Sequence, residues 1–294
     1  MQITADMVKE LRDRTGAGMM ECKKALTASD GNIDAAVDAM RKSGLAKADK
    51  RAGRVAAEGR VVIQAEGDGQ RVVMLEANCE TDFVARGDEF RDFAERVANK
   101  ILETSPVDMA ALSATTLEAT ATVEEVRQGL VAKIGENMAL RRFTVLNSSN
   151  GSRFATYLHG TRIGVVVELL GGSAELGKDI AMHVAASRPV CVSASQVPEE
   201  LVAKERAIFT ALSAESGKPP AIIEKMVEGR VRKFLDEVAL TGQPFVKDPN
   251  LTVGKLLADQ KASVVSFVRY EVGEGIEKKS ADFAAEVMAQ VRGD

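Results

Sequence analysis

The sequence is poor in the residues that most often build catalytic and metal centres. Among 294 residues there are three cysteines, two histidines and no tryptophan. The cysteines lie far apart, at Cys22, Cys79 and Cys191, without C-x-x-C spacing, so we expect neither a disulfide framework nor a zinc site. His183 lies among apolar residues at helical spacing, which favours a core histidine over a ligand. No G-x-S-x-G motif is present, and we expect no catalytic residue, metal or cofactor.

Long apolar runs and an excess of basic charge are also missing. No stretch approaches the roughly 18 apolar residues that a membrane span needs, and residues 1–6 do not resemble a signal peptide. We therefore expect a cytoplasmic protein without a membrane interaction. The net charge of −4 argues against direct nucleic-acid binding through a broad basic face. The length is sufficient for two or more domains with their own cores.

The N-terminal 54 residues are predicted to form three short helices, the last of which ends at Ser43-Gly44. Residues 47–60 combine basic residues with alanine and glycine, as in a solvated linker. The helical module is similar to ubiquitin-associated-type domains, which bind partners. Met19 and Met20 fit either core positions or an adaptable exposed surface, and both interpretations remain open.

Strand patterns dominate the middle of the chain. Two β-type runs at 60–65 and 70–75 flank a Gly-rich turn, which predicts a β-hairpin. A helix is expected at 88–102, followed by a weaker helical stretch over 105–135. Further strands are expected at the ranges 140–145, 153–158, 165–170 and 262–272.

A short loop, from Glu76 to Arg86, connects the predicted strand at 70–75 to the helix at 88–102. It contains Thr81, Asp82 and Phe83 in succession, although aromatic residues make up only 4% of the chain. One interpretation is that Thr81 or Asp82 caps the helix while Phe83 enters the core. The other is that the loop is exposed and functional.

An internal comparison favours the exposed loop. A second strand and helix, at 165–170 and 178–184, repeat the first pair, with Glu168 corresponding to Glu76. The first copy is five residues longer, and the additional residues fall between Thr81 and Arg86. Insertions in one copy of a repeat usually form surface loops.

The second copy contains a phosphate-loop-like sequence. Residues 172–179 fit GxxxxGK after a strand and before a helix. The eighth position is Asp179, however, where a phosphate loop needs a hydroxyl for Mg²⁺, and a carboxylate there repels phosphate. A nucleotide-binding enzyme or switch is therefore the weaker alternative.

Two helical stretches, 199–215 and 221–240, are predicted to form an antiparallel hairpin. We expect one apolar stripe on each arm, and a projecting hairpin is favoured over one folded onto the core. The stripes are Leu201, Ile208 and Leu212 on the first arm, and Ile223, Val227, Phe234 and Val238 on the second. A last helix is expected at 282–291, where it either seals the core or docks on a partner.

Six segments carry a specific resemblance that covers nearly the whole chain in order. They are Leu11–Leu26, Glu76–Arg86, Tyr157–Arg162, His183–Ala186, Leu240–Phe245 and Phe267–Glu277. Together they resemble the bacterial elongation factor Ts family. One departure is Ala77, where the family usually has a branched aliphatic residue.

The resemblance implies a function without chemistry of its own. The family promotes guanine-nucleotide exchange on elongation factor Tu in translation, and the loop Thr81–Val84 would enter the partner beside its Mg²⁺ site. By the same resemblance, Phe83 wedges between partner side chains and Asp82 helps to disturb the Mg²⁺-bound arrangement. The N-terminal module and the core would add contacts through Arg12, Met19, Met20 and His159. The resemblance also implies that the hairpin is an oligomerisation arm for a homodimer or a 2:2 complex.

The predicted fold class is α+β: a ubiquitin-associated-like three-helix module, a core of two related α/β subdomains with antiparallel sheets, an inserted helical hairpin and a C-terminal helix. A plain scaffold protein with a ubiquitin-associated-like module is a third interpretation. The expected divisions are 1–55 for the helical module, 56–146 for the first core subdomain, 147–190 and 242–275 for the second, 191–241 for the hairpin and 276–294 for the C-terminal module.

Overall fold

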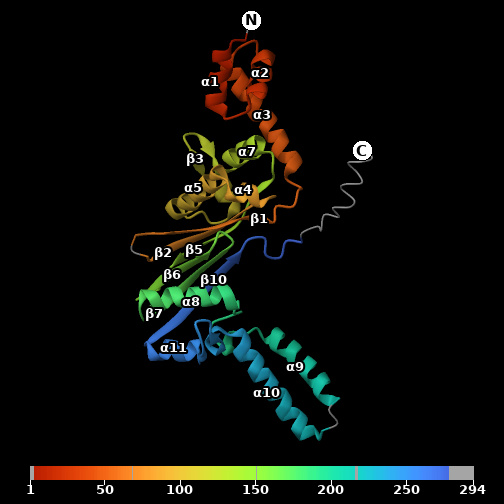
Figure 1. Cartoon of the computed structure of the whole chain (residues 1–294), viewed down its shortest axis with the longest axis vertical. Helices are drawn as coiled ribbons and strands as arrows, with labels where there is room; N and C mark the ends of the chain where they lie inside the picture. Colours follow the sequence, from red (N-terminus) through yellow and green to blue (C-terminus); the bar gives the residue numbers. More distant parts are fainter. Residues whose placement is uncertain (1–2, 68, 150, 216–217, 278–294) are drawn as a thin grey trace. The chain divides into compact units, whose positions relative to one another are not determined.

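The computed structural model describes residues 3–277 apart from residues 68, 150, 216 and 217 (Figure 1). The predicted C-terminal helix at 282–291 lies outside the described residues. Two compact units are present. The first contains the described parts of 1–62, 75–143 and 272–294, and the second those of 63–74 and 144–271. No helix among the described residues is both long and apolar enough to span a bilayer.

The chain begins with three helices, as predicted. They are α1 (Ala5–Thr15), α2 (Met19–Ala28) and α3 (Ile33–Arg51). The side chain of Thr4 caps α1 by accepting a hydrogen bond from Met7, and Gly16 ends it with a left-handed φ of 65°. Their shared core consists of Val8, Leu11, Cys22, Leu26 and Ala36.

The predicted end of the third helix at Gly44 is wrong, since α3 continues to Arg51. The reason is close contact between helices in the first unit. Gly44 is buried, and a methyl group built on it would lie 3.3 Å from the Cβ of Ala132 in α7 (Val123–Ile134). Gly44 therefore does not end a helix but allows α3 and α7 to approach each other closely. Because α3 continues to Arg51, the linker predicted at 47–60 is shorter than expected.

A first sheet has the strand order β1-β2-β5. The predicted hairpin is β1 (Glu58–Ala65) and β2 (Arg71–Cys79), and β5 (Met138–Asn147) lies beside β2. Two helices follow β2 directly, α4 (Asp82–Arg86) and α5 (Asp88–Thr104). Helix α5 buries one apolar face that includes Phe90, Phe93, Val97 and Ile101.

The helical stretch predicted over 105–135 is interrupted. It contains α6 (Met109–Ala114), a small antiparallel pair, β3 (Thr116–Glu118) and β4 (Ala121–Thr122), and then α7. Thr122 is both the last strand residue and the first half of a capping box with Glu125, which starts α7. The β-branched threonines therefore mark a turn and a cap within a sequence that otherwise favours helix.

The second unit has the same order of elements as the first: a β-hairpin, then a helix, and later in the chain a third strand that joins the sheet. Its sheet has the order β10-β7-β6, with every neighbouring pair antiparallel. Helix α8 covers one face (Figure 1), with Ile180 and Val184 against Val165, Val167 and Leu169. The elements are β6 (Ser152–His159), β7 (Ile163–Gly171), α8 (Ala174–Ser187), β8 (Pro244–Phe245), β9 (Asp248–Thr252), α11 (Val253–Asp259) and β10 (Ala262–Glu271).

The inserted helical hairpin is formed by α9 (Glu199–Ala214) and α10 (Pro220–Val238), which make most of their contacts with each other. At its base, α10 contacts the short helices η1 (Ala194–Gln196) and η2 (Leu240–Gly242).

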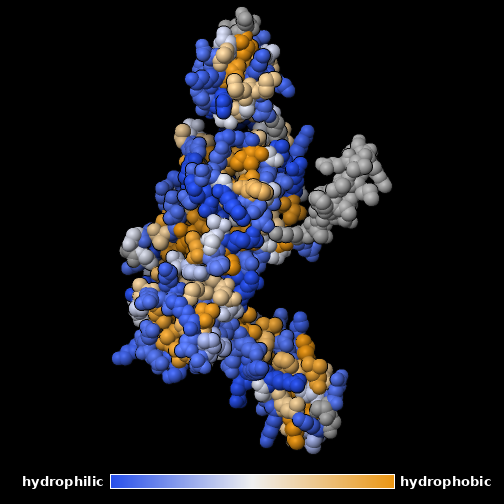
Figure 2. Space-filling model, in the orientation of Figure 1, coloured by the Kyte–Doolittle hydropathy of each residue, from blue (hydrophilic) through white to orange (hydrophobic). Residues whose placement is uncertain are grey.

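The predicted stripe on α9 is partly wrong. Ile208 and Leu212 are 42% and 54% exposed, whereas the less exposed positions are Leu201, Val202, Glu205, Phe209 and Ser213. The sequence did not indicate this face because two of its positions, Glu205 and Ser213, are polar. Figure 2 shows hydrophobic surface along the hairpin, where Ile208, Leu212 and Ile222 remain exposed.

Candidate functional site

The loop that contains Thr81, Asp82 and Phe83 folds as one short helix, α4, between a buried strand and a long helix. Thr81 is extended and caps α4, because its side-chain oxygen accepts a hydrogen bond from the Val84 N–H at 3.4 Å. Gly87 ends α4 and is also the N-cap of α5. The second copy of the repeat has no such turn: β7 ends at Gly171 and α8 begins at Ala174. The five additional residues of the first copy therefore form α4.

Phe83 lies on the outer side of this turn with 83% of its surface exposed. Two residues later, Ala85 is buried, so α4 is seated on the first unit through one face while it presents the phenyl ring on the other. The two interpretations of the loop are thus both partly correct, because a capped helix start and an exposed aromatic coexist. An aromatic side chain in water, on a turn with fixed ends, is typical of a binding anchor.

Asp82 is the first residue of α4 and does not cap it. Its carboxylate forms an ion pair with Arg86 one turn later, at 3.0 Å, and half of its side chain is exposed. Such a surface pair contributes little to stability. The Asp82 carboxylate is therefore half-exposed beside Phe83, held only by a weak surface ion pair.

The residues just before α4 are fixed by hydrogen bonds to buried or partly buried groups. The Cys79 thiol donates to the Thr81 carbonyl oxygen at 3.1 Å. Burial, together with the nearby charges of Glu136 and Glu58, raises the pKa of Cys79 to about 12, which keeps the thiol protonated and unreactive. Glu136 also accepts hydrogen bonds from Thr81. Sequence reasoning did not identify Glu136, which lies 55 residues away from Thr81.

Met19 and Met20 are on the surface of the N-terminal module, 57% and 67% exposed. They occupy the first turn of α2, outside the module's core, and this decides between the two interpretations of the methionine pair. Arg12 is exposed in the last turn of α1, and the short loop after Gly16 connects the two helix ends. A flexible, exposed apolar pair, with an exposed cation on the preceding helix, is suited to contact with a partner protein.

His159 ends β6 in the second unit and is exposed. Its Nδ1 lies 3.2 Å from the Tyr157 hydroxyl, two residues earlier on the same strand. Leu158 between them is 44% exposed. His183, in contrast, is fully buried, as its apolar neighbours predict.

The neighbours of His183 fix its tautomer. Its Nδ1 accepts from the Val246 N–H, so Nε2 donates to the Gln243 side chain at 2.9 Å. Burial lowers the pKa of His183, and the bond to Gln243 only partly opposes this shift. The imidazole is therefore a structural connection between α8 and the segment around residue 245.

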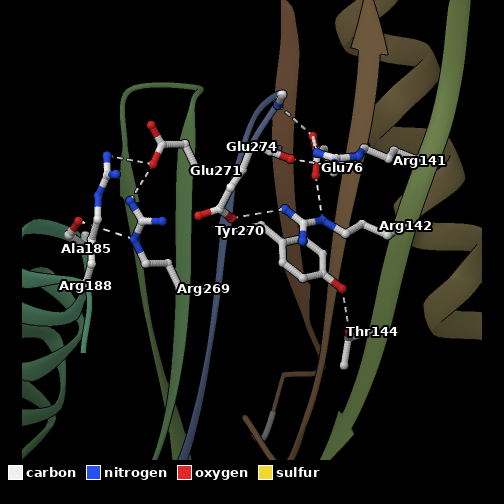
Figure 3. Close-up of polar contacts among 11 residues, drawn as sticks. Glu76, Arg141, Arg142, Thr144, Ala185, Arg188, Arg269, Tyr270, Glu271 and Glu274 are labelled. Atoms are coloured by element: carbon white, nitrogen blue, oxygen red, sulfur yellow. Dashed lines mark hydrogen bonds and ion pairs between the residues drawn. The ribbon is translucent and has the colours of Figure 1, made fainter. Parts of the chain in front are cut away.

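Ion pairs support both units (Figure 3), and the one centred on Glu76 is buried. In the first unit, the Glu76 carboxylate is fully buried and accepts hydrogen bonds from Arg141, Arg142 and the Gly273 N–H at 2.9, 2.6 and 2.8 Å. Burial alone would raise the pKa of Glu76, but these three donors outweigh it and lower the pKa. Glu76 therefore stays ionised and fastens β2 to β5 just before the α4 turn.

In the second unit, Glu271 lies between two cations. It forms ion pairs with Arg269 and Arg188 at 2.6 and 2.8 Å (Figure 3). The hydrogen bond from Arg269 is the main reason that the pKa of Glu271 is lowered. Sequence reasoning singled out neither ion-pair network, because Arg141, Arg142 and Arg188 lie far along the chain from the glutamates with which they pair.

The phosphate-loop-like sequence does not form a phosphate loop. Helix α8 begins at Ala174, so most of the motif is helical and only Gly172 and Ser173 remain to connect strand and helix. A methyl group on Gly177 would lie 2.6 Å from the Cβ of Ala155, which shows that this glycine serves close contact between α8 and β6. Asp179 is paired with Lys247 at 2.5 Å. The described residues also contain no cluster of three or more His, Cys, Asp or Glu placed to hold a metal ion.

The fold and the site therefore define a protein that presents exposed side chains on anchored turns, and comparison with known proteins gives its family. The sequence model described as Elongation factor TS matches residues 80–274. Elongation factor Ts of Thioalkalivibrio sulfidiphilus is 61% identical over 293 residues, covering the full length of both chains. The proteins of the same name from Methylococcus capsulatus and Legionella pneumophila strain Philadelphia 1 are 61% and 58% identical over 99% of each chain. The chain belongs to the elongation factor Ts family, which is known for nucleotide exchange on elongation factor Tu.

Proposed function

We propose that this chain is a cytoplasmic guanine-nucleotide exchange factor that binds elongation factor Tu in its GDP-bound and nucleotide-free forms. It disturbs the partner's Mg²⁺ and phosphate site and promotes the release of GDP, so that GTP can bind. The observation that carries the proposal is Phe83, an aromatic side chain 83% exposed on a turn whose ends are fixed.

The roles of the loop residues follow from their positions. Thr81 caps the turn, Phe83 is the wedge that enters the partner, and Val84 follows it on the same turn as part of the contact. Asp82 brings a carboxylate toward a site that contains Mg²⁺ and phosphate in the partner. A negative charge there competes with phosphate oxygens for the cation and repels the phosphates themselves.

The other candidate residues enlarge the contact. Arg12, Met19 and Met20 would touch the partner's nucleotide domain, and His159 its third domain. The exposed apolar residues of the hairpin, Ile208 and Leu212, support a role in a homodimer or a 2:2 complex. We propose no direct contact with nucleic acid or membrane.

The mechanism is thermodynamic linkage and needs neither catalysis nor a cofactor. A protein that binds nucleotide-free elongation factor Tu more tightly than the GDP-bound form must weaken GDP binding by the same factor. It requires no site for GDP on its own surface. The six divisions of the chain given above remain our assignment of its modules.

The release of labelled GDP from elongation factor Tu, with and without this protein, tests the proposal. We expect a large acceleration that saturates with protein concentration. If release is unchanged and the isolated chain does not bind GDP, the protein is a scaffold. If the isolated chain binds GDP, it is a nucleotide-binding switch.

A further inference from the structure

Two segments of the first unit, residues 80–81 and 136–137, form reciprocal hydrogen bonds next to the start of α4. Glu136 Oε2 accepts a hydrogen bond from the Thr81 N–H at 3.0 Å, and Glu80 Oε1 accepts one from the Asn137 N–H at 2.5 Å. Each segment thus offers a glutamate to the backbone of the other. We call these four residues, Glu80, Thr81, Glu136 and Asn137, the glutamate clasp.

Glu136 contacts Thr81 twice. Besides accepting from the backbone, its other carboxylate oxygen accepts from the Thr81 hydroxyl at 2.7 Å. Hydrogen bonds to a carboxylate are shorter and stronger than those between neutral groups, and two of them on one residue also fix its orientation. The hydroxyl proton points to Glu136, so the oxygen keeps a lone pair for the Val84 N–H that it caps.

This arrangement matters because α4 has only five residues. A single helical turn is not stable by itself, since its nucleation costs more than its few hydrogen bonds return. The direction of Phe83 therefore depends on how Thr81 is held. Glu136 fixes the N-cap of the turn on which Phe83 is the second residue.

The clasp also reaches the end of the N-terminal module. The Asn137 side-chain amide donates to the carbonyl oxygens of Arg54 and Ala52 at 2.7 and 3.3 Å. Arg54 in turn forms an ion pair with Glu80 at 3.6 Å. The residues just after α3 are thereby attached to the same point as the loop, which strengthens the anchorage.

From these contacts we infer that Glu136 is a positioning residue for nucleotide exchange. It does not contact the partner's nucleotide, but holds Thr81 so that Phe83 is presented in its productive direction. The inference rests on the proposed function of the loop. Small errors in the placement of a contact group can cost up to about 10²-fold in rate, so we expect a loss of roughly tenfold when both bonds to Thr81 are removed.

The test compares Glu136→Ala in two backgrounds, the natural chain and Phe83→Ala. Labelled-GDP release from elongation factor Tu is measured at saturating factor and expressed per folded molecule, with thermal melts of all four proteins. In the natural chain we expect release to be about tenfold slower. In the Phe83→Ala background the same change should alter release less than twofold, because there is no ring left to position. The charge control is Glu103→Gln on α5, which should leave release unchanged.

The outcomes separate the inference from the proposed function. If Phe83→Ala slows release but Glu136→Ala has no effect, or slows release equally in both backgrounds, the positioning role is wrong and the function stands. If Phe83→Ala itself leaves release unchanged, the function proposed for the loop fails and the inference fails with it. Should Glu136→Ala not fold, Glu136→Gln, which replaces one of the two acceptor oxygens with an NH2 donor, must slow release in the natural chain only.

Discussion

Glu76 and Glu168 occupy corresponding positions on the central strands of the two sheets, and each buries its carboxylate among a different set of donors. Glu76 is held by two arginines and one backbone N–H. Glu168 is held by the hydroxyls of Ser149, Ser152 and Ser266 and by the Ser149 N–H, at 2.6–3.0 Å. The two copies of the repeat therefore share a buried carboxylate, but its hydrogen-bond donors differ between them.

The hydrogen bonds of Glu168 make the second unit sensitive to acid. Burial would raise its pKa, but the serine donors outweigh burial and lower it to about 2, from an ordinary 4.5. Between these values the folded state binds fewer protons than the unfolded state, so stability present above pH 4.5 is lost as the pH falls toward 2. In Glu168→Gln, the free energy of unfolding should depend less on pH in this window, by up to about 1.4 kcal/mol per pH unit. Urea unfolding between pH 3 and 6 measures it, and parallel pH profiles for the two proteins would contradict the account.

Thr81 and Asp82 should behave differently, although they are neighbours in the loop. Thr81→Ala removes a cap and should reduce stability by about 1 kcal/mol. Asp82 only pairs with Arg86 on the surface, so Asp82→Ala should change the free energy of unfolding by less than about 1 kcal/mol while it slows GDP release. Chemical denaturation and GDP-release assays on both variants decide this. A large loss of stability in Asp82→Ala would show that its carboxylate supports the fold.

The helical hairpin should be removable without unfolding the second unit. A deletion must stop short of Leu240, which is fully buried in the core, and of Ala239, which pairs with Cys191. Replacing residues 203–233 with a short Gly/Ser link keeps the base of both helices. We expect cooperative unfolding and intact exchange, because α9 and α10 contact mainly each other. Sedimentation should show the loss of any dimer, whereas a non-cooperative melt would place the hairpin within the core.

The free protein should bind neither GDP nor GTP. The GxxxxGK sequence is helical from Ala174 onward, and Asp179 is paired with Lys247. Calorimetric titration with Mg²⁺-GDP should give no saturable heat. Micromolar binding that disappears in Lys178→Ala would instead establish the nucleotide-binding alternative.

The sequence was sufficient to predict the elements with strong periodicity, and most strands and long helices lie within a few residues of their expected bounds. Sequence-based prediction failed where a tertiary contact determines the local structure or the burial of a residue. Gly44 reads as a helix end because its role, close approach to Ala132, is visible only in three dimensions. Ser213 has the sequence character of a surface residue although it is fully buried on α9.

The candidate site shows the same limit. A loop with an unusual aromatic could be found from an internal comparison, and Phe83 was the residue to select. The partner of Thr81 could not be found, because Glu136 lies on a connection between α7 and β5 with no pattern of its own. Long-range side-chain to backbone contacts leave no periodic signal in the sequence.

The most direct test of the exchange function is to measure how fast the Phe83→Ala variant releases GDP from elongation factor Tu. Val107→Ala is the control, because Val107 is also highly exposed, at 91%. Truncating an exposed ring should change the free energy of unfolding by less than about 0.5 kcal/mol. Burial of a Phe in a partner contributes roughly 1.5–3 kcal/mol, and about 1.4 kcal/mol corresponds to tenfold. We therefore predict release that is roughly ten- to hundredfold slower for Phe83→Ala and unchanged for Val107→Ala, with both proteins melting near the natural chain. Normal release by folded Phe83→Ala would contradict the account.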